Sequence, residues 1–266
     1  MTTRTTLFLL FEIALFSRHI AAQEIPKDPQ LFSHSVEQIF VFKQIFEVTS
    51  MAHFTETSSI GIQIENRYHL EELTKKQLYL FRKWKEHGLQ WHIKHTGYSN
   101  FGTLDGRIGY SRMWNKKISV GMDFIYLLQH ANGYTTRNCI TFSISLFGKV
   151  NSKTGVGFQL FNPVQLGFWG EQFTSIPIQL DFFGYYVIHK NMMLSLSVTK
   201  YAPGKVDCSF TSIIQHQKLG IQYTLSMKTS GFGISYRFKR FHLHTSFQYH
   251  YQLGGSPGTY LIYQWN

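Results

Sequence analysis

From Ser58 onward, apolar side chains alternate with small or polar ones at a period of two residues. In an extended strand, this period sends the two classes of side chain to opposite faces. Phe232, Ile234 and Tyr236, for example, share one face, whereas Gly233 belongs to the other. The alternation recurs along the chain, so the sequence predicts an all-β protein built from amphipathic strands.

The alternation predicts about fourteen strands, with twelve as the alternative count. It is clearest near the end of the chain, in three consecutive segments separated by a few polar residues. The strands are expected at residues 60–65, 76–84, 89–94, 106–114, 119–130, 135–150, 155–160, 176–188, 192–200, 206–214, 218–228, 231–238, 241–251 and 259–265.

The segments that join these strands differ in length. Short polar joins fall at 115–117, 151–153, 189–191, 215–217 and 239–240. Longer stretches that contain glycine or proline fall at 162–175 and 253–257. Tight turns on one rim and longer loops on the other are typical of outer-membrane barrels.

The composition indicates which face of the strands meets water. Only 15% of the residues are charged, and the polar face consists mainly of glycine, serine, threonine, glutamine and histidine. A soluble β-sandwich or lipocalin, the alternative reading, carries more charge on its wet face. We therefore predict a transmembrane, antiparallel, up-and-down β-barrel, with apolar residues toward lipid. Aromatic residues near strand ends, expected to form an interfacial girdle, are Trp84, Tyr98, Trp114, Tyr126, Tyr251, Tyr263 and Trp265.

The first 22 residues have the features of a secretory signal peptide. Arg4 precedes the apolar stretch Leu7 to Phe16, and cleavage is expected after Ala22. A short amphipathic helix is the alternative. No later window holds 18 consecutive apolar residues, so no transmembrane helix is expected. We predict a signal peptide at 1–22, a plug or periplasmic extension at 23–57 and a barrel at 58–266, exported through the inner membrane to the outer membrane.

The net charge of +11 comes from 26 lysines and arginines against 15 acidic residues. These cations are spread thinly along the chain and form no basic run, which argues against nucleic acid as a partner. We expect a mildly cationic barrel interior, with an interior of paired charges as the alternative. The candidate lining residues are His92, Lys94, Arg107, Lys218, Arg237, His242, His244 and His250.

No motif in the sequence indicates catalysis, a metal site or a cofactor. His242 and His244 are expected to share one face of a strand, but residues two apart lie about 7 Å from each other, too far to chelate one ion. The stretch from His130 to Gly133 lacks the serine that a lipid hydrolase motif requires, so it is interpreted as a turn. Cys139 and Cys208 are expected on opposite faces, as free thiols.

Three short motifs resemble those of a known family. Residues 65–73 follow the first strand, 161–163 close a middle strand and 253–257 precede the last strand. This arrangement is similar to the PorV and PorQ group of Gram-negative outer-membrane proteins, FadL-like barrels of about fourteen strands associated with type IX secretion. The resemblance covers most of Ser58 to Asn266. The motif residues, to which it implies a structural role, are Glu65, Asn66, Arg67, Tyr68, Asn162 and Pro163.

Two features depart from the family pattern. The segment from Phe32 to Phe54 is bulky instead of rich in glycine and alanine, and the chain ends on Asn266 instead of an aromatic residue. Charges at Glu65, Arg67 and Glu71 or Glu72 are expected to brace the bend after the first strand.

The resemblance implies a non-enzymatic role, as an accessory or scaffold in protein secretion and surface translocation. The alternative is a FadL-like passive channel for a small hydrophobic or anionic solute, and a remote alternative is an outer-membrane lipid hydrolase. The expected partners are outer-membrane lipid and secretion-system proteins, without a cofactor.

Overall fold

A computed structural model of the chain describes residues 47–54, 57–169 and 174–265. The expected signal peptide, most of the expected N-terminal segment and Asn266 lie outside the described residues. No helix within the described ranges is long and apolar enough to cross a membrane.

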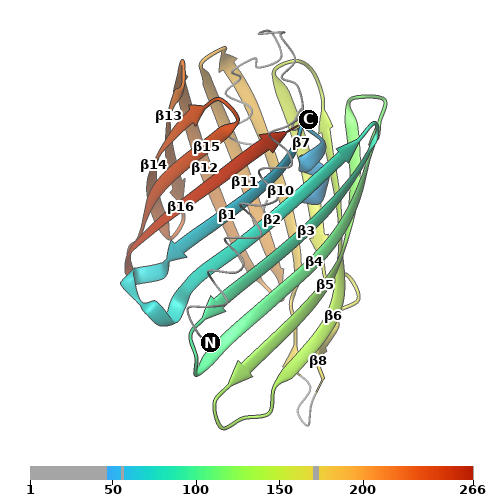
Figure 1. Cartoon of the computed structure of the whole chain (residues 1–266), viewed down its shortest axis with the longest axis vertical. Coiled ribbons are helices and arrows are strands. Elements are labelled where there is room, and N and C mark those ends of the chain that lie inside the picture. The colour runs from blue at the N-terminus through green and yellow to red at the C-terminus, as the bar shows by residue number, and fades with distance from the viewer. Residues whose placement is uncertain (1–46, 55–56, 170–173, 266) are drawn as a thin grey trace. The chain divides into compact units, whose positions relative to one another are not determined.

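Fourteen strands form one closed antiparallel barrel, as the alternation predicts (Figure 1). The barrel strands are β1 (Ser58–Asn66), β2 (Thr74–Trp84), β3 (His87–Gly97), β4 (Phe101–Trp114), β5 (Ile118–Ala131), β6 (Arg137–Lys149), β7 (Thr154–Phe161), β10 (Ile178–His189), β11 (Met192–Ala202), β12 (Lys205–His216), β13 (Leu219–Ser226), β14 (Thr229–Phe238), β15 (Phe241–His250) and β16 (Gly254–Trp265).

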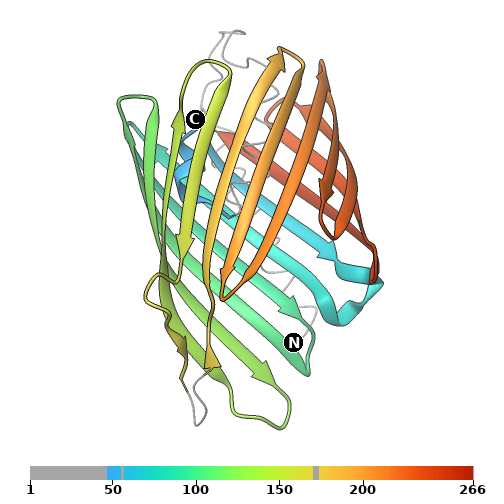
Figure 2. The ribbon, with the colours of Figure 1, turned by 180° about the vertical axis from the view of Figure 1, so that it is seen from behind.

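Each strand pairs with its neighbours in sequence, and the barrel closes where β1 pairs with β16. The closing register runs from Ser58 opposite Trp265 to Glu65 opposite Gly258. Closure leaves no barrel edge with unpaired backbone groups, which is the condition for placing a sheet in lipid. Two further strands, β8 (Gly167–Phe168) and β9 (Thr174–Ser175), form a separate ribbon within the connection from β7 to β10 (Figure 2).

The two ends of the barrel differ in their connections. At the end where β1 begins and β16 ends, which we call the short-turn rim, the turns are 85–86, 115–117, 150–153, 190–191, 217–218 and 239–240. At the opposite end, the loop rim, the connections include the two longest, 67–73 and 162–177. The predicted loop at 253–257 is wrong, since β16 begins at Gly254. Its glycines and proline hide the strand from the alternation, but their backbones still pair with β15.

Apolar side chains lie on the outer face of the barrel, and small polar side chains lie inside it. Large apolar residues such as Ile108, Phe124 and Phe182 are more than half exposed on the outer face. Ser143 and Ser145, by contrast, are fully buried inside. This orientation confirms the prediction that the apolar face points away from the barrel interior. Trp265 differs from the expected girdle residues, because only 8% of it is exposed.

Candidate functional site

A short 3-10 helix, η2 (Thr49–Phe54), lies inside the barrel against β3, β4, β5 and β6. All of its residues from Thr49 to His53 are buried. Val48 and Met51 belong to one apolar cluster with inward side chains of the surrounding strands, and Ala52 belongs to a second cluster. These side chains are Phe147, Phe183, Tyr185, Met193 and Ile213 in the first cluster and Tyr79, Phe81, Tyr260 and Ile262 in the second. We call these two clusters with η2 the apolar plug.

Hydrogen bonds fix η2 and the residues before it to several strands. The Thr49 hydroxyl donates to the Asp123 carboxylate, and the Ser50 amide donates to Ser145 Oγ at 3.2 Å. Lys83 Nζ donates to the carbonyl of His53 at 3.0 Å. Gln159 Nε2 donates to the carbonyl of Glu47 at 3.1 Å. The described part of the expected N-terminal segment, 47–54, is therefore an internal element of the barrel.

His53 is a buried residue of η2. Its ring packs edge-on against Phe81, with the ring centroids 5.9 Å apart. Burial lowers the pKa of His53 below its ordinary value, and the charge of Lys83 lowers it further.

A polar cavity of about 520 Å³ borders the apolar plug. Val48, Leu127, Phe161 and Phe183 are its apolar lining residues. The rest of the lining consists of charged, amide, imidazole and hydroxyl groups from Glu47, which precedes η2, and from strands β2, β3, β4, β7, β10, β11 and β12. These residues are Glu47, Gln77, His92, Lys94, Asp105, Arg107, Gln159, Gln179, Asp181, Ser195, Ser197, Thr199, Tyr201, Ser209 and Thr211.

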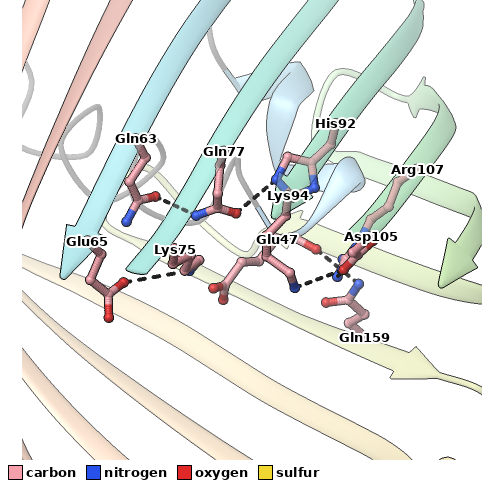
Figure 3. Close-up of polar contacts among 10 residues, drawn as sticks. All are labelled: Glu47, Gln63, Glu65, Lys75, Gln77, His92, Lys94, Asp105, Arg107 and Gln159. Carbon is pink, nitrogen blue, oxygen red and sulfur yellow. Dashed lines mark hydrogen bonds and ion pairs between the residues drawn. The ribbon is translucent and has the colours of Figure 1, made fainter. Parts of the chain in front are cut away.

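One wall of the cavity carries three charged groups in contact, Lys94 on β3 with Asp105 and Arg107 on β4 (Figure 3). Arg107 donates from Nε and Nη2 to the two carboxylate oxygens of Asp105, at 2.9 and 2.7 Å. Lys94 Nζ lies 2.8 Å from Asp105 Oδ2. Lys94 and Asp105 are direct partners in the β3–β4 register, which explains their contact. The group carries two positive charges and one negative, so its net charge is +1. We call it the charged triad.

Amide groups continue this wall across the neighbouring strands β2 and β1, where Gln77 is the register partner of Lys94 and Gln63 is the register partner of Gln77. His92 Nε2 lies 2.9 Å from Gln77 Oε1, and Gln77 Nε2 donates to Gln63 Oε1 at 2.8 Å (Figure 3). Beyond them, Glu65 contacts Lys75 at 3.7 Å. The polar groups of this wall thus form contacts with one another, which offsets the cost of removing them from water.

The wall across the barrel, on β10 to β12, presents hydroxyl groups around one carboxylate. Thr199 Oγ1 donates to Asp181 at 2.6 Å, and Gln179 Nε2 donates to it at 2.7 Å. The hydroxyls of Ser197 and Ser209 lie 2.7 Å apart. The cavity therefore offers cations on one side and hydroxyls with a hydrogen-bonded carboxylate on the other, a lining suited to small polar molecules.

The candidate lining residues fall into three groups. His92, Lys94 and Arg107 line the cavity. Arg237, His242 and His244 are buried on inward positions of β14 and β15, away from the cavity lining, and both histidines stack on Tyr260, at 4.6 Å from His244. The remaining two, Lys218 and His250, lie near the rims.

The placement of Lys218 on the interior face is wrong. Lys218 lies exposed in the turn 217–218, because β13 begins only at Leu219 and Gln217 adopts the positive φ of a tight turn. His250 ends β15 at the loop rim, where its Nδ1 accepts from the amides of Gln252 and Leu253, both at 3.2 Å. Its ring also packs edge-on against Tyr68.

The motif residues after the first strand lie at the loop rim. Glu65 Oε1 accepts from Arg67 Nε at 3.0 Å, which is the kind of bracing expected there. Asn66 ends β1, and Tyr68 follows with a φ of 58°. Glu71 and Glu72, the expected further members of this charged group, are exposed in the 3-10 helix η4 (Glu71–Leu73).

The second motif organises the long connection between β7 and β10. Asn162 is fully buried, and its Nδ2 donates to the carbonyls of Leu166 and Ile176, at 2.9 and 2.8 Å. Its Oδ1 accepts from the Leu166 amide and the Thr141 hydroxyl. Pro163 follows it in the turn. Asn162 thus tethers both ends of this loop to the barrel.

Sequence reasoning missed the acidic members of the interior. Asp105 is the centre of the charged triad, and Asp181 anchors the hydroxyl wall. Asp105 and Arg107 are two residues apart, a spacing that puts both on one face of a strand. That spacing was the available signal for the triad, whereas Asp181 gives no comparable signal.

Neither metal binding nor a disulfide has support in the described part of the chain. No group of three or more histidine, cysteine or acidic side chains there is arranged to hold a metal ion. Cys139 is buried and Cys208 is half-buried, and both thiols are free.

Comparisons with known proteins show a likeness of fold. No family model matches the chain, and no curated protein matches its sequence. Solved structures do match. The Pseudomonas putida toluene transporter TodX gives a TM-score of 0.62 at 8% identity, over 84% of this chain and 93% of that one.

Two further structures match to the same degree. A Pseudomonas aeruginosa FadL homologue gives a TM-score of 0.62 at 8% identity, over 84% of this chain and 94% of that one. The Ralstonia pickettii toluene transporter TbuX gives 0.61 at 8% identity, over 84% and 93%. At this identity the likeness concerns the fold alone.

Proposed function

We propose that this protein is an outer-membrane passive channel for small polar or anionic solutes. The observation that carries the proposal is the polar cavity, enclosed in a closed barrel whose outer face is apolar. An outer face of this kind requires lipid around it, and short turns on one rim are typical of outer-membrane barrels.

The lining favours a polar solute over a hydrophobic one. Structures of the same fold are described as a toluene transporter and a monoaromatic hydrocarbon channel. A hydrocarbon would have to displace water from the charged triad without replacing its hydrogen bonds, which is unfavourable. An anion, by contrast, gains contacts with Lys94 and Arg107, the two cations of a lining that also carries the carboxylates Asp105, Glu47 and Asp181.

Passage also requires a route past the apolar plug. Met51 is fully buried in it, and truncation of such a side chain costs about 2–5 kcal/mol of packing. A double substitution, Met51→Ala with Thr49→Ala, also removes the hydrogen bond to Asp123. We call this double substitution the plug-weakened variant and expect it to conduct more than the native chain.

The experiment is permeation through the purified full chain in lipid bilayers. Liposome swelling with potassium gluconate and with arabinose, together with planar-bilayer currents in potassium chloride, compares the native chain with the plug-weakened variant. We expect solute entry that rises when the plug is weakened. Absence of swelling and of current from both proteins would overturn the proposal.

A second pair of variants tests the role of the triad. Lys94→Gln with Arg107→Gln removes both cavity cations, and gluconate entry is expected to fall more than arabinose entry. Lys218→Gln is the matched control, because this lysine is exposed in a turn. Equal effects of the cavity and control substitutions would contradict an anion route.

The accessory role in protein secretion stays a prediction that rests on the motif resemblance. Affinity purification of the chain from native membranes tests it directly. Retention of a large secretion complex would favour that role, and recovery of the barrel without such a complex would favour the channel.

A further inference from the structure

Positive charge is concentrated at one end of the barrel. Each of the six turns of the short-turn rim carries at least one lysine, and Glu86 is the one acidic residue among them. The cations in these turns are Lys85, Lys116, Lys117, Lys153, Lys190, Lys218, Lys239 and Arg240. The described residues of the loop-rim connections hold Arg67 and Lys228 against Glu71 and Glu72. Since short turns face the periplasm in such barrels, the short-turn rim meets the phospholipid leaflet.

A groove of about 930 Å³ lies beside one of these turns, on β4 and β5. Tyr110, Arg112 and Trp114 alternate along the outward face of β4 and line it together with Lys116 of the turn. Val120 and Met122, on β5, are exposed and extend this lining with apolar surface. Glu86 also borders the groove.

The groove is held in shape by the sheet and the turn. Arg112 is paired in register with His87 on β3 and with Val120 on β5. The Tyr110 hydroxyl lies 2.6 Å from His87 Nδ1, which fixes the tyrosine ring at one side. Asn115 and Lys116 both have positive φ, 51° and 54°, so a tight turn holds Lys116 at the rim.

Arg112 is the unusual member of this surface. Its side chain is exposed on the face that meets lipid, where arginine is unfavourable unless it lies near the headgroups. Among the described residues, neither Arg112 nor Lys116 forms an ion pair. Two cations beside aromatic rings and an apolar strip match a ligand with a phosphate attached to acyl chains.

We propose that this groove binds the headgroup of an anionic phospholipid, with Arg112 and Lys116 on the phosphate and the acyl chains along Val120 and Met122. With Glu86, the groove has a net charge of +1, the complement of a headgroup of charge −1 such as phosphatidylglycerol. The hydroxyls of that headgroup can donate to the Glu86 carboxylate. A zwitterionic headgroup would not balance the charge of the groove.

The test is quenching of tryptophan fluorescence by brominated lipid around the reconstituted full chain. Dibrominated phosphatidylglycerol is titrated into phosphatidylcholine vesicles, and the same titration of Trp114→Phe isolates the signal of Trp114, which is 68% exposed at the groove. We expect Trp114 to report preferential binding of phosphatidylglycerol. Arg112→Gln and Lys116→Gln should each weaken this preference about fivefold, because the attraction of one lysine or arginine to an anionic lipid surface corresponds to a change of about that size.

Lys190→Gln is the matched control, because it removes one cation from the same rim at a turn outside the groove. The preference for phosphatidylglycerol that Trp114 reports should change by no more than about twofold in this variant. Equal losses of preference in Arg112→Gln and Lys190→Gln would mean that the lipid responds to the overall charge of the rim and not to the groove, and would overturn the proposal. Equal quenching by dibrominated phosphatidylethanolamine would also overturn it. Full displacement by soluble glycerol phosphate would indicate a phosphate site instead of a lipid site.

Discussion

Replacing Asp105 with asparagine tests the charged triad most directly. Asp105 binds both Lys94 and Arg107, and only 5% of its side chain is exposed. The substitution keeps the size of the side chain and removes one negative charge, so the net charge of the triad rises from +1 to +2. The cavity should therefore attract anions more strongly.

The size of the effect follows from the distance and the medium. A charge about 4 Å from a permeating ion contributes about 1 kcal/mol when water fills the space between them, which is about fivefold in relative occupancy. The same substitution also leaves Lys94 and Arg107 without the negative charge that both of them contact. Breaking a buried ion pair costs about 3–5 kcal/mol, and we expect the lower end because the triad borders a cavity.

The assay is the reversal potential of the plug-weakened variant in a potassium chloride gradient, with and without Asp105→Asn. We expect the anion-to-cation permeability ratio to rise about fivefold. Glu72→Gln is the matched control, since it removes one negative charge at an exposed position of the loop rim. An unchanged ratio for Asp105→Asn, or the same change in both variants, would refute the assignment of the triad to the permeation route.

Three further predictions concern packing, pH and the long loop. Gly157→Ala should destabilise the barrel by about 1–3 kcal/mol, because its Cβ would lie 2.6 Å from Phe183 Cζ and 2.8 Å from the Leu146 carbonyl oxygen. Urea unfolding in vesicles measures this loss, and Gly106→Ala, which has open space around it, should stay within about 0.5 kcal/mol. The pKa of His53 is lowered while η2 is packed inside the barrel, so His53 binds a proton more readily when η2 is detached from the strands. The contribution of His53 to the packing of η2 is therefore present above the ordinary pKa of 6.5 and is lost as the pH falls below it. Hydrogen exchange of 49–54 should therefore increase on acidification, and His53→Phe should remove that increase. Asn162→Ala loses four hydrogen bonds and strains a φ of 53°, so protease cleavage within 163–169 should rise, and should rise less in Asn162→Gly, which removes the same bonds without about 1–2 kcal/mol of backbone strain. Equal cleavage of the two variants would exclude a contribution from the backbone.

The alternation of the strands was readable in the sequence because it depends on local geometry. Leu219, Ile221 and Tyr223 point outward together, since every second side chain of a strand lies on one face whatever its partners are. The same rule placed His92, Lys94 and Arg107 on inward positions. Lys218 shows the limit of the rule, because it has the right parity but belongs to the turn.

The contacts within the interior depended on the register between strands. Lys94 opposes Asp105 because the turn at 98–100 sets the β3–β4 register, and the alternation pattern does not encode that offset. A shift by two residues would preserve every face and separate this pair.

The sequence by itself determined the fold class, the approximate number of strands and the face that most strand side chains take. Only the tertiary structure decided that η2 packs against β3 to β6, that the charged triad forms on one wall and that His242 and His244 lie away from the cavity. The physical reason is that the two-residue period comes from the geometry of a single strand, whereas these contacts come from closing fourteen strands in one register.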